Sequence, residues 1–248
     1  MATLFISDLH LEADRPEIGT QFLAFLEGEA RSADALYILG DLFDVWVGDD
    51  DPNEHYAEMK LALRSLVDSG VPVYFMHGNR DFMIGADFAA ETGVKILPDP
   101  HAIELYGTSV LLSHGDAMCT DDLEYQQVRL MTRNPQWQAM MLTKSLEERI
   151  MFAAAARSKS QNRNASLSAE IMDVNQNEVE KLIAEHGVDV LLHGHTHRPA
   201  VHDVDLGERA AQRIVLGDWY EQGSVLRWDE SGYSLDVMPR PRDVTPLP

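Results

Sequence analysis

The stretch Tyr37-Ile38-Leu39-Gly40-Asp41-Leu42-Phe43-Asp44 decides the fold, because an apolar run ends there at a glycine with Asp41 at its exit. Four other apolar runs also end in clusters of Asp, His or Asn, at residues 8–10, 77–81, 113–116 and 193–197. Such runs alternate with helical patterns, which is typical of an α/β domain. Ligands in such domains sit at the carboxyl ends of strands. We therefore interpret Asp41 as the centre of these clusters.

The composition indicates a globular protein without a secretion or membrane-spanning signal. The chain has 248 residues, enough for one large domain or two small ones, and 45% of them are hydrophobic. No window approaches the 18 or so apolar residues of a spanning helix, and the first residues lack the basic region of a signal peptide. A single cysteine excludes an internal disulfide and fits a reducing cytoplasm.

The charge is strongly acidic and unevenly distributed. A formal net charge of −21 argues against a nucleic-acid-binding protein and against simple electrostatic adhesion to anionic lipid. Residues 123–168 nevertheless hold seven basic and three acidic side chains, so this segment carries +4 and the rest of the chain −25. A basic island in an acidic protein indicates a separate structural unit that faces an anion.

The strand and helix patterns divide the chain into a core and an insertion. We expect strands at residues 3–7, 35–39, 71–76, 96–105, 109–112, 188–192, 214–216, 224–228 and 233–237. We expect core helices at residues 17–30, 56–69, 86–92 and 170–186, and a loose tail at 239–248. Residues 123–168 show no strand pattern, so we interpret them as an inserted helical cap on a core of residues 1–122 and 169–248.

Two helices are predicted within this cap. The first covers residues 123–132, with Asp121 or Asp122 as its N-cap, and the second covers residues 136–157. A polar tail follows at residues 158–164.

Seven side chains at five strand exits form a candidate site for two metal ions: Asp8, His10, Asp41, Asn79, His114, His195 and His197. Residues i and i+2 of a strand point the same way, so the two pairs at 8/10 and 195/197 can each converge. Carboxylate, amide and imidazole donors without a thiolate suit Mn, Fe or Zn better than Ca. Seven ligands are too many for one ion, but they serve two if Asp41 bridges.

Alternative explanations exist for each of these residues taken alone. A single histidine is more often a surface or hydrogen-bonded residue, and Asp41 could cap a turn. Five motifs in the same place relative to a strand make coincidence a poor explanation. Gly40, Gly78, Gly115 and Gly194 each adjoin a candidate ligand, where a tight turn or a close backbone approach would require glycine.

These motifs carry a family resemblance that covers residues 8 to 197. They are Asp8-x-His10, Gly40-Asp41, Gly78-Asn79-Arg80-Asp81, His114-Gly115-Asp116 and Gly194-His195-Thr196-His197. The series resembles that of the calcineurin-like metallophosphoesterases. The resemblance implies two mixed β-sheets sandwiched between helices, and a hydrolase with two metal ions.

A narrower resemblance covers nearly the whole chain except its C-terminal tail. It lies in residues 33–43, 47–52, 171–177 and 193–202, which are similar to the UDP-2,3-diacylglucosamine diphosphatase family. That family implies a cytoplasmic enzyme of lipid A (lipopolysaccharide) biosynthesis, peripherally associated with the inner membrane. Its reaction cleaves an acylated UDP-sugar to UMP and 2,3-diacylglucosamine 1-phosphate (lipid X) by direct attack of metal-activated water.

The narrower resemblance also implies roles for individual residues. One ion, usually Mn²⁺, would be held by Asp8, His10, Asp41 and His197, and the second by Asp41, Asn79, His114 and His195. Substrate contacts would come from Asn79, Arg80, Asp122, Ser160, Asn164 and His195, of which Asn79, Arg80 and His195 would act in catalysis. The family pattern has a lysine where this chain has Leu167, and Arg163 is the neighbouring cation that could replace it.

Arg80 indicates which bond the site breaks. Related phosphoprotein phosphatases carry a histidine after the motif asparagine, placed to protonate an alkoxide leaving group, and arginine cannot do this near neutral pH. A phosphate leaving group, whose second pKa is about 6, needs little protonation. Arg80 therefore favours pyrophosphate cleavage, with a surface ion pair to Asp81 as the alternative interpretation.

The cap sequence suggests how a lipid substrate is held. Its apolar residues could form a slot for acyl chains and contact the bilayer, or simply pack on the core; they are Trp137, Met140, Met141, Leu142, Leu146, Ile150, Met151 and Phe152. Its basic residues could meet phosphate or lipid headgroups, or form a solvated helix face; they are Arg149, Arg157, Lys159 and Arg163. Competing functions are a dinuclear phosphoesterase for nucleotides or nucleic acid, and a non-catalytic scaffold, which would be expected to have lost ligands.

Overall fold

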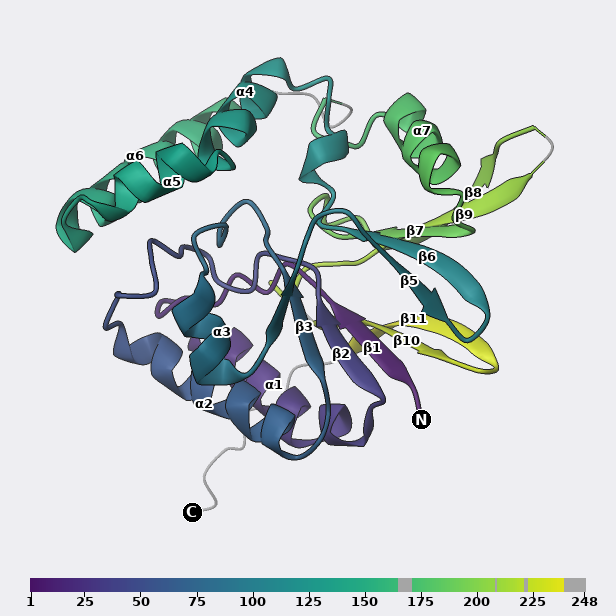
Figure 1. Ribbon diagram of the computed structural model, residues 1–248, viewed down its shortest axis with the longest axis horizontal. Coiled ribbons are helices and arrows are strands. Elements are labelled where there is room, and N and C mark those ends of the chain that lie inside the picture. Colours follow the sequence, from purple (N-terminus) through teal and green to yellow (C-terminus); the bar gives the residue numbers. More distant parts are fainter. Residues whose placement is uncertain (165–170, 208, 221–222, 239–248) are drawn as a thin grey trace, which may run out of the picture.

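Two mixed β-sheets form the centre of the computed structural model, which describes residues 1–164, 171–207, 209–220 and 223–238. The side chains of 161, 162 and 164 lie outside this description. Helices cover the outer face of each sheet (Figure 1). This arrangement confirms the predicted α/β class with two sheets between helices.

The first sheet has the strand order β11-β10-β1-β2-β3-β4. Its strands are β1 (Thr3–Ile6), β2 (Ala35–Ile38), β3 (Val73–Met76), β4 (Lys95–Leu97), β10 (Gly223–Asp229) and β11 (Gly232–Met238). Strands β1 to β4 run parallel, and the β10–β11 hairpin joins β1 in antiparallel fashion. The carboxyl ends of β1, β2 and β3 therefore lie along one edge.

The second sheet has the order β5-β6-β7-β9-β8. Its strands are β5 (His101–Leu105), β6 (Thr108–Ser113), β7 (Val190–His193), β8 (Ala200–Asp205) and β9 (Ala210–Val215). Strands β6, β7 and β9 are parallel, so the exits of β6 and β7 also share an edge.

Three apolar layers hold these elements together. Between the sheets, Phe5 and Leu39 of the first pack with Leu112 and Leu192 of the second, and all four are fully buried. Helices α1 (Pro16–Glu27), α2 (Glu54–Asp68) and α3 (Ala86–Thr92) cover the outside of the first sheet. Helix α7 (Gln176–His186) covers the second. Two short 3₁₀ helices, η1 (Glu29–Ser32) and η2 (Asp116–Met118), complete the core.

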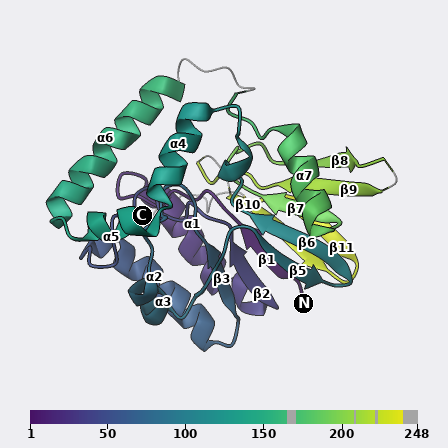
Figure 2. The same cartoon turned by 45° about the horizontal axis from the view of Figure 1, so that its top comes forward.

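Three helices between η2 and α7 lie over the end of the core where the strand-exit loops gather. They are α4 (Leu123–Thr132), α5 (Pro135–Leu142) and α6 (Leu146–Asn164), and Figures 1 and 2 show them side by side. Helix α4 has its predicted bounds, and Asp122 caps it by accepting from the Tyr125 N–H at 2.8 Å.

The prediction of one helix over residues 136–157 with a polar tail was wrong, because α5 and α6 are separate and α6 extends through the tail. Ser145 and Glu148 form a reciprocal capping box at the break. The Ser145 N–H donates to Glu148 Oε2 at 2.9 Å, and the Glu148 N–H donates to Ser145 Oγ at 3.2 Å.

Other elements also differ from the prediction, among them β9, which covers Ala210–Val215 where a strand was expected at 214–216. Helix α7 begins at Gln176 instead of 170, since the Asn175 side chain caps it. Residues 96–105 contain parts of two strands, β4 and β5, and β8 was not predicted. The tail 239–248 lies outside the described residues. Within the part of the chain that is described, no helix is both long and apolar enough to cross a bilayer.

An aromatic cluster fixes the loop that follows β2. The Phe43 ring lies 4.7 Å from that of Trp46, 4.6 Å from that of Tyr56 on α2 and 5.9 Å from that of Phe88 on α3, between ring centroids. All four side chains are buried. The loop that carries Asp41 is therefore anchored on two helices.

Replacing Phe43 with alanine should destabilise the whole fold. A buried Phe→Ala change costs about 3–5 kcal/mol through lost burial and the cavity left behind. In a chain of this size each kcal/mol lowers Tm by about 2–4 °C. Thermal unfolding followed by circular dichroism measures this. The control is Leu61→Ala on α2, whose side chain is 68% exposed, and an equally small effect in both variants would contradict the anchoring.

Candidate metal centre

Five loops meet at the edge where the two sheets deliver their strand ends. They follow β1, β2, β3, β6 and β7 and carry all seven predicted ligands. In the first half of the site, His197 Nε2 lies 3.3 Å from Asp8 Oδ1 and 3.3 Å from His10 Nε2. Asp8, His10 and His197 thus present one donor atom each to a common point.

The second half of the site surrounds His114. Its Nε2 atom lies 3.1 Å from Asn79 Oδ1, and its ring centroid lies 5.1 Å from that of His195. Asp41 stands between the halves, with Oδ2 at 3.8 Å from His10 Nε2 and Oδ1 at 3.8 Å from His114 Nε2. Its two oxygens thus face different histidines, as a bridging carboxylate requires.

The donor set fits divalent cations. Asp8, His10, Asp41 and His114 are at most 2% exposed, and the histidine nitrogen nearest to Asp8 Oδ1 among the described residues is His197 Nε2, at 3.3 Å. A buried carboxylate is costly unless a cation compensates it. Asp8, Asp41 and His114 form a second group that could hold an ion, so Asp8 belongs to both groups.

The backbone brings these side chains together by a different route from the one predicted. Asp8, His10, Asp41, His195 and His197 lie after the strands, and all have positive φ angles, between 51° and 67°. The alternation of side chains along a strand therefore does not explain their convergence. Left-handed backbone at a non-glycine residue is uncommon and persists where the surrounding structure enforces it.

Two glycines are required by close approach. A Cβ atom at Gly78 would lie 2.0 Å from Asp41 Oδ1, and one at Gly194 would lie 2.3 Å from Asp8 Oδ2. These contacts involve the carboxylates themselves. Any side chain at either position would displace a candidate ligand.

Asp81 holds two of the loops together from below. Its carboxylate accepts hydrogen bonds from the backbone N–H groups of Leu42 at 2.7 Å, Gly78 at 2.8 Å and Asp41 at 3.3 Å. Asp81 is fully buried, so it is not part of a surface ion pair with Arg80. Burial and the nearby Asp41 raise the pKa of Asp81 to about 6.

Electrostatics divides the histidines into two groups. Although burial opposes it, the carboxylates of Asp41 and Asp116 raise the pKa of His114 to about 9. Asp218 and Asp8 likewise raise the pKa of His197 to about 10 against the effect of burial. Burial lowers the pKa of His195 to about 3. Without metal, His114 and His197 hold protons at neutral pH, so cation binding must release them and weakens as pH falls.

Asp218 and Tyr220 surround the first half of the site and were not predicted. Asp218 Oδ2 lies 3.2 Å from His197 Nδ1, which leaves Nε2 of that ring directed at Asp8. The Tyr220 ring stacks on His10, with centroids 5.2 Å apart and planes 8° apart. Asp218 follows Ile214-Val215-Leu216-Gly217, so it repeats the pattern of an apolar run ending in Gly-Asp.

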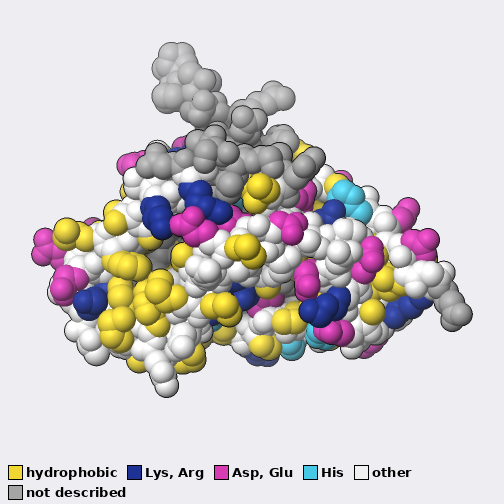
Figure 3. Space-filling view, turned by 90° about the horizontal axis from the view of Figure 1, so that it is seen from above, with side chains coloured by type: hydrophobic (Ala, Val, Ile, Leu, Met, Phe, Trp, Pro, Cys, Tyr) yellow, Lys and Arg dark blue, Asp and Glu magenta, His cyan; other side chains and the backbone are white. Residues whose placement is uncertain are grey.

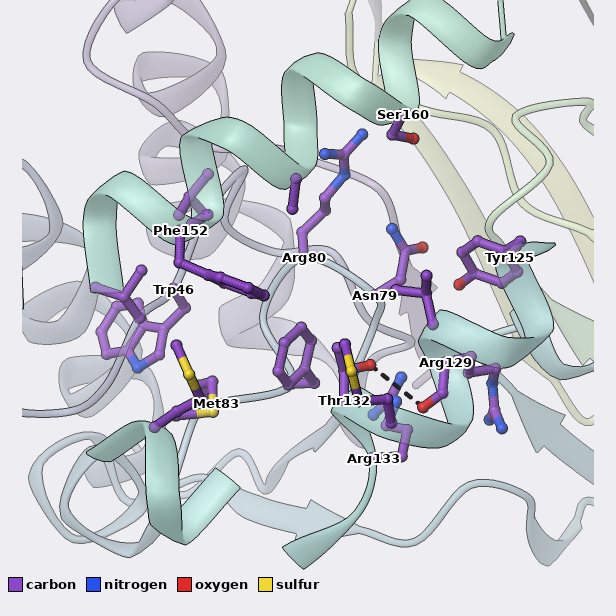
Figure 4. Close-up of a pocket in the computed structure, with 18 of the residues that line it drawn as sticks. Trp46, Asn79, Arg80, Met83, Tyr125, Arg129, Thr132, Arg133, Phe152 and Ser160 are labelled. Carbon is purple, nitrogen blue, oxygen red and sulfur yellow. Dashed lines mark hydrogen bonds between the residues drawn. The ribbon is translucent and has the colours of Figure 1, made fainter. Parts of the chain in front are cut away.

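A cavity of about 220 Å³ opens beside the site, between the strand-exit loops and helices α4 to α6. Asn79, Arg80 and Ser160 line it, and Figure 4 shows Arg80 and Ser160 near one another and Asn79 beside Tyr125. Tyr125 donates to Asp116 Oδ2 at 2.8 Å and packs on His195, with centroids 5.8 Å apart. His195 thus lies behind the wall of the cavity.

The remaining predicted substrate contacts occupy different positions. Asp122 does not line the cavity, and its carboxylate pairs with Arg163, which does. The side chain of Asn164 and all of Leu167 lie outside the described residues.

The basic residues of helix α6 pair mainly with carboxylates. Arg149 donates to Asp50 and to the Val47 carbonyl. Arg157 pairs with Asp44 and Glu12 of the core. Lys159 and Arg163 both contact Glu124 within the cap. The interpretation as a solvated helix face is wrong for Arg149, which is 3% exposed.

Replacing Asp218 with asparagine should weaken metal binding without unfolding the chain. Without the carboxylate, His197 is less basic and its ring is less firmly oriented. Such changes typically lower the affinity for the metal about 10–100-fold. Titration with Mn²⁺ followed by calorimetry measures this, with thermal unfolding of the metal-free protein as a second readout. Asp14→Asn, at an exposed position, is the control, and equal affinities in all three proteins would contradict the role.

Comparison with known proteins identifies the family. The calcineurin-like phosphoesterase family matches residues 1–199. UDP-2,3-diacylglucosamine hydrolase of Stenotrophomonas maltophilia (strain K279a) is 55% identical over 247 residues, covering 97% of this chain and 100% of that protein. The protein of the same name from Enterobacter sp. (strain 638) is 51% identical, covering 96% and 100%. Both resemblances drawn from the sequence are confirmed, and the chain belongs to the calcineurin-like phosphoesterase family.

Proposed function

We propose that the chain hydrolyses the pyrophosphate bond of UDP-2,3-diacylglucosamine, giving UMP and 2,3-diacylglucosamine 1-phosphate in lipid A biosynthesis. The observation that carries this proposal is the juxtaposition of a buried Asp/His cluster with an apolar cavity, with Asn79 and Arg80 on the wall between them. A water-soluble phosphoester would need only the polar cluster. The names of the two relatives support the same substrate.

Two Mn²⁺ ions are the proposed cofactor, with Asp41 as the shared ligand. Asp8, His10 and His197 would complete one ion's shell, and Asn79, His114 and His195 the other's. Such a pair lowers the pKa of a bound water and neutralises charge on the phosphoryl oxygens. The buried Asp8 Oδ1 atom and the two close imidazole Nε2 atoms of His10 and His197 support this assignment.

Arg80 is proposed to stabilise charge on the pyrophosphate. Its backbone N–H donates to Asp41 Oδ1 at 2.8 Å, which fixes the residue at the edge of the cluster. Its Nε atom is buried and has no partner among the described residues, and its side chain lines the cavity. A guanidinium placed this way can bind two phosphate oxygens at once. Asn79 and His195 are proposed to contact the same phosphoryl group from the second half of the site.

Residues 123–168 are proposed to act as a cap that receives the acyl chains. The cavity wall away from the polar cluster is apolar and includes Trp46, Met83 and Phe152, which Figure 4 labels. Trp137 and Met141 of the predicted slot also line it. Four other residues of the predicted slot lie on the outer surface: Met140, Leu142, Ile150 and Met151 are 45–66% exposed.

The exposed apolar side chains of the cap support a peripheral contact with the inner membrane at its cytoplasmic face. Figure 3 shows hydrophobic side chains gathered at the end of the molecule where α5 and α6 lie. Leu130 and Met151 are 70% and 66% exposed, and contiguous exposed apolar patches mark protein–protein or membrane interaction sites. A bilayer there would bring the acylated substrate to the cavity.

The proposed function is tested by UMP release from UDP-2,3-diacylglucosamine in the presence of Mn²⁺. We expect release with this substrate, loss of release when a chelator removes the metal, and much weaker activity on the deacylated UDP-sugar. Activity that persists in chelator would reject the metal assignment. Equal activity on both UDP-sugars would reject the lipid substrate.

Replacing Arg80 with alanine should lower turnover by about 10²–10³-fold, as expected for loss of one group that stabilises transition-state charge. Both metal ions should remain bound, since Arg80 contacts Asp41 through its backbone. Steady-state kinetics and metal analysis of the purified variant measure the two effects. Arg80→Lys is the matched control, and turnover equal to wild type in Arg80→Ala would reject the role.

Replacing both Trp137 and Met141 with serine should raise KM for the acylated substrate by roughly tenfold or more, because burying one large apolar side chain is worth about 1.5–3 kcal/mol. KM for the deacylated UDP-sugar should change little. Met151→Ser removes an apolar side chain from the outer surface and serves as the control. Equal effects of the double change on both substrates would contradict the acyl slot.

A further inference from the structure

A second cavity of about 220 Å³ lies at the end of the second sheet, outside the metal centre and the apolar cavity. Its floor comes from β8 and β9, through Ala200, His202, Arg213 and Val215. Thr196 and Arg198, which flank His197 in the chain, line it together with Asp173. The cavity is therefore next to the metal centre along the loop that follows β7.

Arg213 occupies an unusual place in this sheet. In the register of the strands, Leu111 lies opposite Leu191, Leu191 opposite Arg213, and Arg213 opposite His202. Side chains directly opposite one another share a face of the sheet. Leu111 and Leu191 belong to the apolar layer under α7. The row thus changes from leucines to an arginine and a histidine where it reaches the cavity.

The Arg213 guanidinium is almost fully buried but has no hydrogen bond within the described ranges. The residue is 8% exposed, and its Nε atom has no acceptor. Its nearest carboxylate oxygen, Asp173 Oδ1, is 3.9 Å from Nη1, which is too far for a hydrogen bond. Asp173 is instead held by Arg198 and by the Val174 N–H. Buried charges are normally paired and hydrogen-bonded, and within the described part of the chain this guanidinium has only the distant Asp173 carboxylate as an ion-pair partner.

The chemistry of the other lining groups matches an anion with several acceptor oxygens. Two guanidinium groups and one carboxylate line the cavity, which leaves an excess of positive charge in a chain of net charge −21. The Thr196 hydroxyl oxygen is also buried without a partner among the described residues, and it can donate. His202 adds a ring nitrogen on the same face as Arg213.

We propose that this cavity binds a phosphate group through Arg213, Thr196 and Arg198. The phosphate could be that of UMP after cleavage, in which case the cavity receives the nucleotide product and the inference rests on the function proposed above. It could also be free inorganic phosphate. Both share the tetrahedral oxyanion that a guanidinium fork binds in bidentate fashion.

The test compares the metal-loaded wild type with Arg213→Met and Arg209→Met. Arg209 precedes β9, pairs with Asp189 at 2.7 Å and is the matched control for charge. Calorimetric titration with inorganic phosphate and with UMP should show one more site in wild type and Arg209→Met than in Arg213→Met. The metal centre is intact in all three proteins, so its own phosphate binding cancels in the comparison.

Stability separates a binding role from a structural one. Arg213→Met removes a buried cation without a hydrogen-bond partner, so its Tm without phosphate should equal or exceed that of wild type. Added phosphate should raise Tm less in this variant than in the other two proteins. A lower Tm in phosphate-free buffer together with an unchanged number of sites would overturn the proposal.

The two phosphate sources are distinguished by UMP and by the acylated substrate. If the cavity holds the nucleotide, UMP binds more tightly than inorganic phosphate, and Arg213→Met weakens product inhibition by UMP by tenfold or more. If it holds free phosphate, inorganic phosphate binds at least as tightly as UMP, and inhibition by UMP is the same in Arg213→Met as in wild type. If Arg213→Met binds both inorganic phosphate and UMP as well as wild type does, the proposal is overturned. The enzymatic function is tested separately, by UMP release from the acylated substrate with the wild-type protein.

Discussion

The structure depends on keeping two carboxylates, Asp8 and Asp41, together in a buried cluster of imidazoles. Burial raises the pKa of Asp41, and so does the charge of Asp8, while the charges of His114 and Arg80 lower it. Other features follow from this constraint. The left-handed backbone angles direct the donors inward, the glycines make room for the carboxylates, and Asp81 holds two loops from beneath. The left-handed backbone angles cost stability locally, and the packing of the apolar layers offsets that cost.

Much of the core could be predicted because its signals are local. An apolar run that ends in glycine and an acidic residue marks a strand exit, and parallel strands bring such exits together. The reason given for convergence was incorrect, however, since Asp8 and His10 lie beyond the strand and turn inward through positive φ angles. Asp218 carries the same Gly-Asp signal after β9. It was overlooked because the C-terminal strands were interpreted only as closing strands.

The cap was harder to predict because its contacts are tertiary. A basic segment in an acidic chain indicated an anion, and the nearest anions proved to be carboxylates of the chain itself, such as Asp50 for Arg149. Sequence cannot distinguish these from a substrate phosphate, because both attract arginine in the same way. The break between α5 and α6 did have a local signal, the capping box of Ser145 and Glu148. The apolar residues on both sides of the break follow one helical pattern, so the pattern alone predicts a single helix.

Asp44 connects two parts of the molecule that the sequence separates by more than a hundred residues. Its Oδ1 atom lies 3.8 Å from His10 Nδ1, and its other oxygen pairs with Arg157 of α6. A movement of α6 that separates Arg157 from Asp44 would leave the full negative charge of Asp44 facing His10. Such a movement would therefore change the charge that faces His10 and, with it, the cation affinity of the site. Linkage is reciprocal, so cation binding would change the free energy of that movement by the same amount.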